Sequence, residues 1–60
     1  MNWLVQARKD RGMTQQDVAD RCGITRQMVS AIERDRAMPS VPVAKAIASI
    51  LVIHWTRFFE

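Results

Sequence analysis

Residues 14–33, TQQDVADRCGITRQMVSAIE, decide the fold of this chain. Thr14 is a good helix N-cap, and Asp17 can reach back to it in a capping box, although Glu or Gln is usual at that position. An apolar stripe at helical spacing follows: Val18, Ala19 and Cys22. Gly23 suits the left-handed residue that ends a helix. The pattern therefore predicts a helix over 15–22.

A second helix start follows after a very short connection. Thr25 is the next N-cap candidate. Val29 and Ile32 then mark the inward face of a helix over 26–33 or 26–34. Only residues 23–25 separate the two helices, which is too short for a long antiparallel hairpin and fits two helices that cross steeply. This is the geometry of a helix-turn-helix.

The rest of the chain predicts three more helices and no strand. Residues 2–11 favour a first helix with a weak apolar face. Ser40 caps a further helix whose inner face is apolar: Ala44, Ile47, Ala48 and Leu51. His54 caps a short last helix that carries three aromatic side chains: Trp55, Phe58 and Phe59. We therefore expect an all-α domain of five helices that spans residues 1–60.

The composition limits the kind of protein. A chain of 60 residues makes one domain at most, near the lower size limit for independent folding. Its one cysteine, Cys22, cannot form an internal disulfide, and Cys22 with His54 cannot supply the four ligands of a zinc site. No secretory signal is visible, and the longest uncharged apolar run, residues 46–56, is far shorter than the ~20 residues of a membrane helix. We therefore expect a cytoplasmic protein without metal or membrane partner, stabilised by helix packing or self-association.

The charge favours a polyanionic partner. Nine Lys and Arg oppose six Asp and Glu, which gives a net charge of +3. A small basic protein favours nucleic acid or an anionic membrane surface, although the same charge is also ordinary for solubility. The charge alone therefore leaves the partner open.

The outer face of the helix over 26–33 carries side chains suited to reading bases. With Val29 and Ile32 inward, an outward set remains: Arg26, Gln27, Ser30, Ala31 and Arg34. Arg matches the O6 and N7 acceptors of guanine, Gln matches N6 and N7 of adenine, and Ala suits the thymine methyl group. The alternative is a solvated face that carries these charges by chance. The short turn before the helix favours DNA.

These residues together resemble the Xre/Cro-type helix-turn-helix family, which includes the phage repressors. The resemblance rests on residues 14–19, residues 23–33, Pro39-Ser40 and Ile47-Ala48, and it extends over nearly the whole chain. It implies a five-helix, phage-repressor-like domain with a central helix-turn-helix, usually dimeric on DNA. The implied base contacts are Thr25, Arg26, Gln27, Ser30 and Ala31. The implied phosphate contacts are Thr14, Gln15, Arg34 and Arg36.

The chain departs from the family pattern at three positions. Asp35 stands where a loop glycine is often found, and aspartate tolerates a left-handed backbone but brings a negative charge near phosphate. Val52 stands where glycine usually ends the fourth helix, so the end of that helix is left open. Ala44 stands where the family has leucine, which thins the core there.

By the same resemblance, Arg8 and Glu33 form an ion pair across the core and hold the first helix against the third. The alternative is that both groups are solvated surface charges. Because a buried ion pair contributes little net stability, the expected role of this pair is to fix the orientation of the helices.

The last twenty residues hold more apolar side chains than one inner face can bury. A surplus remains after the inner face is filled: Val43, Ile50, Ile53, Trp55 and Phe59. Because a small monomer rarely leaves such a patch in water, we expect a homodimer interface formed by Ile50, Ile53, Trp55 and Phe59. The alternative is that Trp55 and Phe59 fold back onto Trp3 and Leu4 and complete a monomeric core.

The sequence thus predicts a sequence-specific, double-stranded DNA-binding transcriptional regulator, a repressor that reads a short near-palindromic operator in the major groove. The alternative is a protein-interaction module, such as an antitoxin-like partner with the same fold. No acid–base pair, nucleophile arrangement or glycine-rich phosphate loop is present, so we expect neither an enzyme nor a cofactor nor a small-molecule substrate. Cys22 is read as a core residue, His54 as a helix cap or surface residue, and the four methionines as core fillers.

Overall fold

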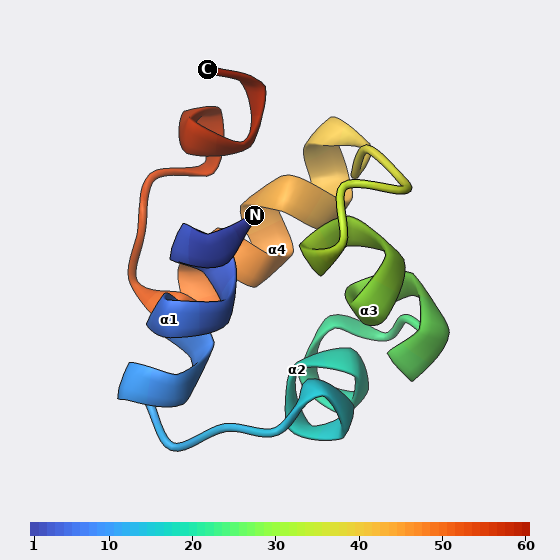
Figure 1. Ribbon diagram of the computed structural model, residues 1–60, viewed down its shortest axis with the longest axis vertical. Coiled ribbons are helices and arrows are strands. Elements are labelled where there is room, and N and C mark those ends of the chain that lie inside the picture. Colours follow the sequence, from blue (N-terminus) through green and yellow to red (C-terminus); the bar gives the residue numbers. More distant parts are fainter.

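The computed structural model describes residues 1–60 and contains four α-helices, a short 3-10 helix and no strand (Figure 1). The α-helices are α1 (Asn2–Asp10), α2 (Gln15–Cys22), α3 (Arg26–Glu33) and α4 (Val41–Leu51). The 3-10 helix is η1 (Trp55–Phe59). The all-α prediction is confirmed. None of the helices is long and apolar enough to cross a membrane.

The prediction of a fifth helix as an α-helix is wrong, because the 3-10 helix η1 takes its place. The Arg57 backbone N–H donates to the His54 carbonyl oxygen at 3.1 Å, an i→i+3 bond of the tighter 3-10 type. A segment of five residues is too short to offset the cost of nucleating an α-helix. His54 stands at the expected cap position, but its side chain makes no capping hydrogen bond.

The ends of α2 and α3 lie where the sequence predicts them. The Asp17 backbone N–H donates to Thr14 Oγ1 at 3.0 Å, and the Thr14 backbone N–H donates to Asp17 Oδ2 at 2.8 Å, so the capping box forms. Gly23 ends α2 in the left-handed region, with φ of 69°. Thr25 Oγ1 then accepts the Met28 backbone N–H at 3.1 Å and starts α3. Only three residues therefore separate the two helices.

One apolar core joins the helices. Its members come from every element: Leu4, Val18, Ala19, Val29, Ile32, Ala44, Ile47, Leu51 and Phe58. The predicted inner faces of α3 and α4 are buried as expected. Figure 1 shows α4 running behind α1, with α2 and α3 on the other side of the molecule from η1. This packing leaves the outer side of α3 free to face a partner.

Two non-glycine residues adopt a left-handed backbone, and both are positions where the chain departs from the family pattern. Asp35 has φ of 60°, and its carboxylate lies 2.8 Å from the Met1 amino group. The negative charge that was expected to face phosphate is therefore paired within the chain. Val52 has φ of 56° and ends α4, with 68% of its surface exposed. The last residue of α4, which the sequence left open, is therefore Leu51.

Candidate nucleic-acid interface

The outer side of α3 forms a shallow hollow with the loop that follows it. Six residues line it: Arg26, Gln27, Ser30, Ala31, Arg34 and Arg36. Arg26 and Gln27 are exposed in the first helical turn, whereas Ser30 and Ala31 are half-buried. Four of the five predicted base contacts therefore share one surface with two arginines, Arg34 and Arg36, that were predicted to meet phosphate.

Thr25, the fifth predicted base contact, stands at the start of the same helix. Its hydroxyl oxygen already accepts the Met28 backbone N–H as the helix cap. A threonine hydroxyl can accept this bond and still donate its own proton. Thr25 therefore combines a structural role with one free donor.

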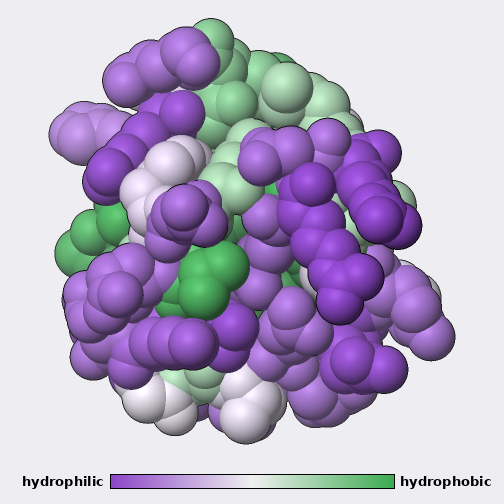
Figure 2. Space-filling model, viewed as in Figure 1, coloured by the Kyte–Doolittle hydropathy of each residue, from purple (hydrophilic) through white to green (hydrophobic).

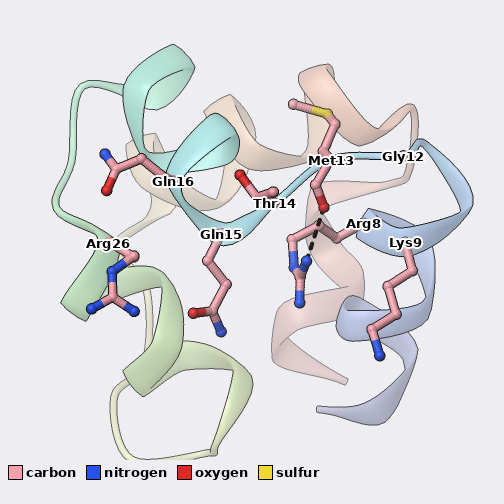
Figure 3. A pocket seen from close by; sticks show the side chains of 8 residues that line it. All are labelled: Arg8, Lys9, Gly12, Met13, Thr14, Gln15, Gln16 and Arg26. Atoms are coloured by element: carbon pink, nitrogen blue, oxygen red, sulfur yellow. Dashed lines mark hydrogen bonds between the residues drawn. The ribbon is translucent and has the colours of Figure 1, made fainter.

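A second hollow lies between the end of α1, the turn after it and the start of α2 (Figure 3). Its lining is mostly polar: Arg8, Lys9, Gly12, Met13, Thr14, Gln15, Gln16 and Arg26. Figure 3 shows the side chains of Arg26, Gln15, Arg8 and Lys9 side by side, although they come from three different helices. Arg8 is neutralised by its buried partner Glu33, so the two cations left beside the N-terminus of α2, Lys9 and Arg26, make a site suited to a phosphate group. Arg26 borders both hollows, so they are parts of one surface.

Lys9 and Gln16 were not predicted as site residues, yet both line this hollow. Each stands next to a residue that was predicted, Lys9 after Arg8 and Gln16 after Gln15. Lys9 lies in the last turn of α1, and the sequence alone does not show that this turn ends beside α2. The sequence therefore could not identify Lys9 as a site residue.

Two side chains that line the second hollow, Arg8 and Gln15, both bind one buried carboxylate, which accepts three hydrogen bonds from them. Glu33 is 7% exposed, and its Oε2 accepts Arg8 Nε at 2.7 Å. Its Oε1 accepts Arg8 Nη2 at 3.3 Å and Gln15 Nε2 at 2.9 Å. Arg8 Nη1 also donates to the Met13 carbonyl oxygen at 2.9 Å. The network joins α1, α2, α3 and the α1–α2 turn, and no buried side-chain polar atom lacks a partner.

The two predicted phosphate contacts at the start of α2, the cap residue Thr14 and Gln15, both make hydrogen bonds within the chain. One N–H of the Gln15 amide goes to Glu33, and its second N–H is left to meet a ligand. The Thr14 hydroxyl is used in the capping box with Asp17. The hydrogen bond from the Thr14 backbone N–H holds the pKa of the Asp17 carboxyl below its ordinary value. Asp17 therefore stays negative and stabilises the helix N-terminus.

Three of the four side chains predicted for a dimer interface pack largely on this chain's own core. Ile50, Ile53 and Trp55 are half-buried against it, and only Phe59 is exposed, at 44%. The Phe59 ring meets the edge of the Trp55 ring at a centroid distance of 6.1 Å, and Lys45 Nζ lies 5.0 Å from the Trp55 ring. These contacts leave Phe59 as the most accessible member of the set.

The fold-back alternative involves a different aromatic residue from those expected. Phe58, and not Trp55 or Phe59, packs against Trp3, with ring centroids 5.0 Å apart. Arg57 covers the Trp3 ring at 4.5 Å. The C-terminal segment thus closes one side of the core beside α1.

The remaining candidate residues form no reactive site. Cys22 is half-buried against the core, and burial raises the pKa of its thiol, which keeps the thiol protonated and poorly reactive. His54 is exposed. No group of three His, Cys, Asp or Glu side chains is arranged to hold a metal ion. The prediction that the methionines fill the core is wrong for Met28 and Met38, which are 42% and 63% exposed.

Comparison with known proteins places the chain in a family. A family model described as Helix-turn-helix matches residues 4–57. The uncharacterized HTH-type transcriptional regulator YqaF of Bacillus subtilis is 41% identical over 58 residues, which cover 97% of this chain and 76% of the relative. An uncharacterized HTH-type transcriptional regulator of Methanothermobacter thermautotrophicus is 46% identical over 44 residues, which cover 73% of this chain and 64% of that protein.

No solved structure matches the chain at a significant level. The family match covers α2, α3 and α4 in full, α1 from Leu4 onward and η1 as far as Arg57, so it includes both hollows described above. The family match, the short α2–α3 connection and the capped ends of both helices all indicate the same family. The chain belongs to the Xre/Cro-type helix-turn-helix family.

Proposed function

We propose that this chain is a sequence-specific, double-stranded DNA-binding transcriptional regulator. The observation that carries the proposal is the exposure of Arg26 and Gln27 in the first turn of α3, at a hollow they share with Arg34 and Arg36. A recognition helix presents its N-terminal residues to base edges, while arginines beside it meet the backbone. Both relatives are named as HTH-type transcriptional regulators, which supports the same role.

The two hollows suggest how the contacts divide. Arg26 and Gln27 donate to base edges, with Ser30 and Ala31 behind them in the same hollow. Arg34 and Arg36 meet phosphates on one side of α3. Gln15, with Lys9 and the N-terminus of α2, meets a phosphate on the other side. Because Arg26 borders both hollows, α3 lies between two phosphate sites and is held in the groove from both sides.

The Arg8–Glu33 pair has an indirect part in this proposal. It touches no expected DNA group but fixes α1 and α2 against the C-terminal end of α3. The pair therefore sets the angle at which Arg26 and Gln27 are presented.

We further propose that residues 1–60 act as one domain that pairs in a two-fold dimer. Apart from Met28, the exposed large hydrophobic side chains all lie between residues 38 and 59: Met38, Val41, Val52 and Phe59. Figure 2 shows moderately apolar surface along the upper edge of this face, smaller strongly apolar patches at its left edge and centre, and mostly hydrophilic surface elsewhere. An interface centred on Phe59 would leave α3 accessible.

Such a dimer would place two recognition helices about 34 Å apart, one turn of DNA, and predicts a near-palindromic operator. We propose the role of a repressor, in which occupation of an operator that overlaps a promoter blocks transcription. Light scattering across a concentration series should show a dimer that Phe59→Lys converts to a monomer. A wild-type protein that stays monomeric at high micromolar concentration would contradict this part of the proposal.

Selection of bound sequences from a random DNA pool tests the proposed function. We expect one preferred site, and binding to it that weakens steeply with salt, with a log–log slope of about −5 for roughly six phosphate contacts. Recovery of no preferred sequence, with binding that is flat between low and moderate salt, would favour the protein-partner alternative instead.

A further inference from the structure

The solvent side of α3 has an apolar flank beside its polar face. Met28 is 42% exposed and is the one exposed large hydrophobic side chain on α3. Met13 and Ile24 on neighbouring segments are partly buried against the core, whereas Met28 does not belong to that packing. The core therefore does not account for the position of Met28.

Met28 lies next to a residue that is already part of the base-facing hollow. It is three residues from Ala31, and residues at this spacing are neighbours on a helix surface. Ala31 lines the hollow with Arg26 and Gln27. An apolar strip of Met28 and Ala31 therefore borders the polar groups that are proposed to read bases.

Met28 also lies at the end of α3 that enters a groove first. Its backbone N–H donates to the Thr25 cap at 3.1 Å, which places it in the first helical turn. The N-terminal residues of a recognition helix are those that reach base edges. Burying an exposed methionine there removes apolar surface from water, which favours binding.

We propose that Met28, together with Ala31, reads the 5-methyl group of thymine in the major groove. This inference rests on the proposed function and adds a specificity-determining residue to it. Among the four standard base pairs, the thymine methyl is the only apolar group exposed on the major-groove edge. The flexible, unbranched side chain of methionine adapts readily to such a group.

Deoxyuridine tests the inference, because it differs from thymidine only by the missing 5-methyl group. Each thymine of the selected site is replaced in turn by deoxyuridine, and the affinity of each duplex is measured by titration. We expect one position per half-site at which the replacement weakens binding about threefold to fourfold, the equivalent of ~0.8 kcal/mol for one buried methyl group. The other thymines should show no such loss.

Three variants assign the effect to the side chain. Met28→Gln keeps the length and helix propensity of the residue but removes its apolar character, and should lose most of the discrimination between thymine and deoxyuridine at that position, with the remainder due to Ala31. Met28→Leu should keep the discrimination. Met38→Gln, at a methionine that is 63% exposed outside α3, is the matched control: any loss of dimerisation would weaken binding to both duplexes alike, so the ratio of the two affinities should stay that of the wild type. Thermal unfolding checks that each variant is folded.

The outcomes separate the inference from the proposed function. A preferred site at which every deoxyuridine duplex binds like its thymine parent overturns the inference and leaves the proposed function intact. Discrimination that is undiminished in Met28→Gln assigns the methyl contact to another residue and overturns the role of Met28. A protein without any preferred site overturns the proposed function, and the inference falls with it.

Discussion

The helix-turn-helix over residues 14–33 and the C-terminal segment over residues 52–60 hold their backbones by different means. In the first region, each helix end has a local cause in the residues beside it. Thr14 and Asp17 cap one another, Gly23 ends α2, and Thr25 starts α3. In the second region, Val52 takes a left-handed backbone and the His54 side chain caps nothing. Contacts with the core, above all those of Phe58, hold that segment in place.

The two regions therefore differ in what determines their structure. Local hydrogen bonds fix the helix ends of the helix-turn-helix, and tertiary packing fixes the C-terminal segment. The angle at which α3 is presented depends in addition on one long-range contact, the Arg8–Glu33 pair. The predictions below test this difference, beginning with the largest effect.

The largest effect should come from the Arg8–Glu33 network, the long-range contact that holds the helix-turn-helix against α1. Glu33→Ala removes a carboxylate that is 7% exposed and leaves the Arg8 guanidinium without its partner. We expect a loss of about 3–5 kcal/mol in the free energy of unfolding, enough to unfold a marginal domain. Urea denaturation, or circular dichroism where the variant is unfolded, measures the effect.

An exposed acidic residue provides the control for that change. Asp10→Ala, on the surface of α1, should alter the free energy of unfolding by no more than about 0.5 kcal/mol. If Glu33→Ala and Asp10→Ala unfold at the same temperature, the buried network does not hold the helices together.

In the C-terminal segment, we expect the free energy of unfolding to depend most on the packing of Phe58. Phe58 is 3% exposed and Phe59 is 44% exposed, so the two neighbours form a matched pair. Phe58→Ala should cost about 3 kcal/mol, at the lower end for a buried phenylalanine because the chain end can partly fill the space. Phe59→Ala should leave the stability of the monomer nearly unchanged. Equal losses measured by thermal unfolding would show that η1 does not close the core through Phe58.

Gly23 ends α2 and Val52 ends α4, so exchanging glycine and valine at these two positions tests the cost of a left-handed backbone in each region. Gly23 and Val52 both have a left-handed backbone, with φ of 69° and 56°. Gly23→Val should destabilise by about 1–2 kcal/mol through backbone strain alone, because a Cβ there meets no atom within 4 Å. Val52→Gly should stabilise by about 0.5–1 kcal/mol, since the strain relieved exceeds the added chain entropy. A Val52→Gly protein that melts below the wild type would show that its left-handed backbone is not strained.

The smallest effect should come from the capping box. The pKa of Asp17 is lowered by the hydrogen bond from Thr14, so the ionised carboxylate favours the folded state. The stabilisation is fully present above the ordinary carboxyl value of 3.8 and is lost as the pH falls through the lower value of the folded protein. Asp17→Asn should remove this part of the acid dependence in thermal unfolding from pH 7 to pH 2, while Asp20→Asn should keep it.

The sequence predicted the parts of the molecule whose causes are local. The capping box, Gly23 and Thr25 specify the ends of α2 and α3, because each acts on backbone groups within a few residues. The turn geometry of η1 was not predictable, since it follows from where Phe58 meets the core. For the same reason, the position of Lys9 beside α2 and the bond from Gln15 to Glu33 required the assembled helices. Met28 was assigned to the core because it is apolar, although its position on α3 turns it outward.

The central claim is that α3 reads base edges through its first turn. Titration of the selected DNA site with Arg26→Ala and Gln27→Ala tests it most directly, with Arg21→Ala as a control that removes an equal charge from α2, away from both hollows. We expect each α3 variant to lose about 1–3 kcal/mol of binding free energy and to relax the preference at one base position, whereas Arg21→Ala binds nearly as well as the wild type. Unchanged affinity and unchanged sequence preference in both α3 variants would contradict the claim.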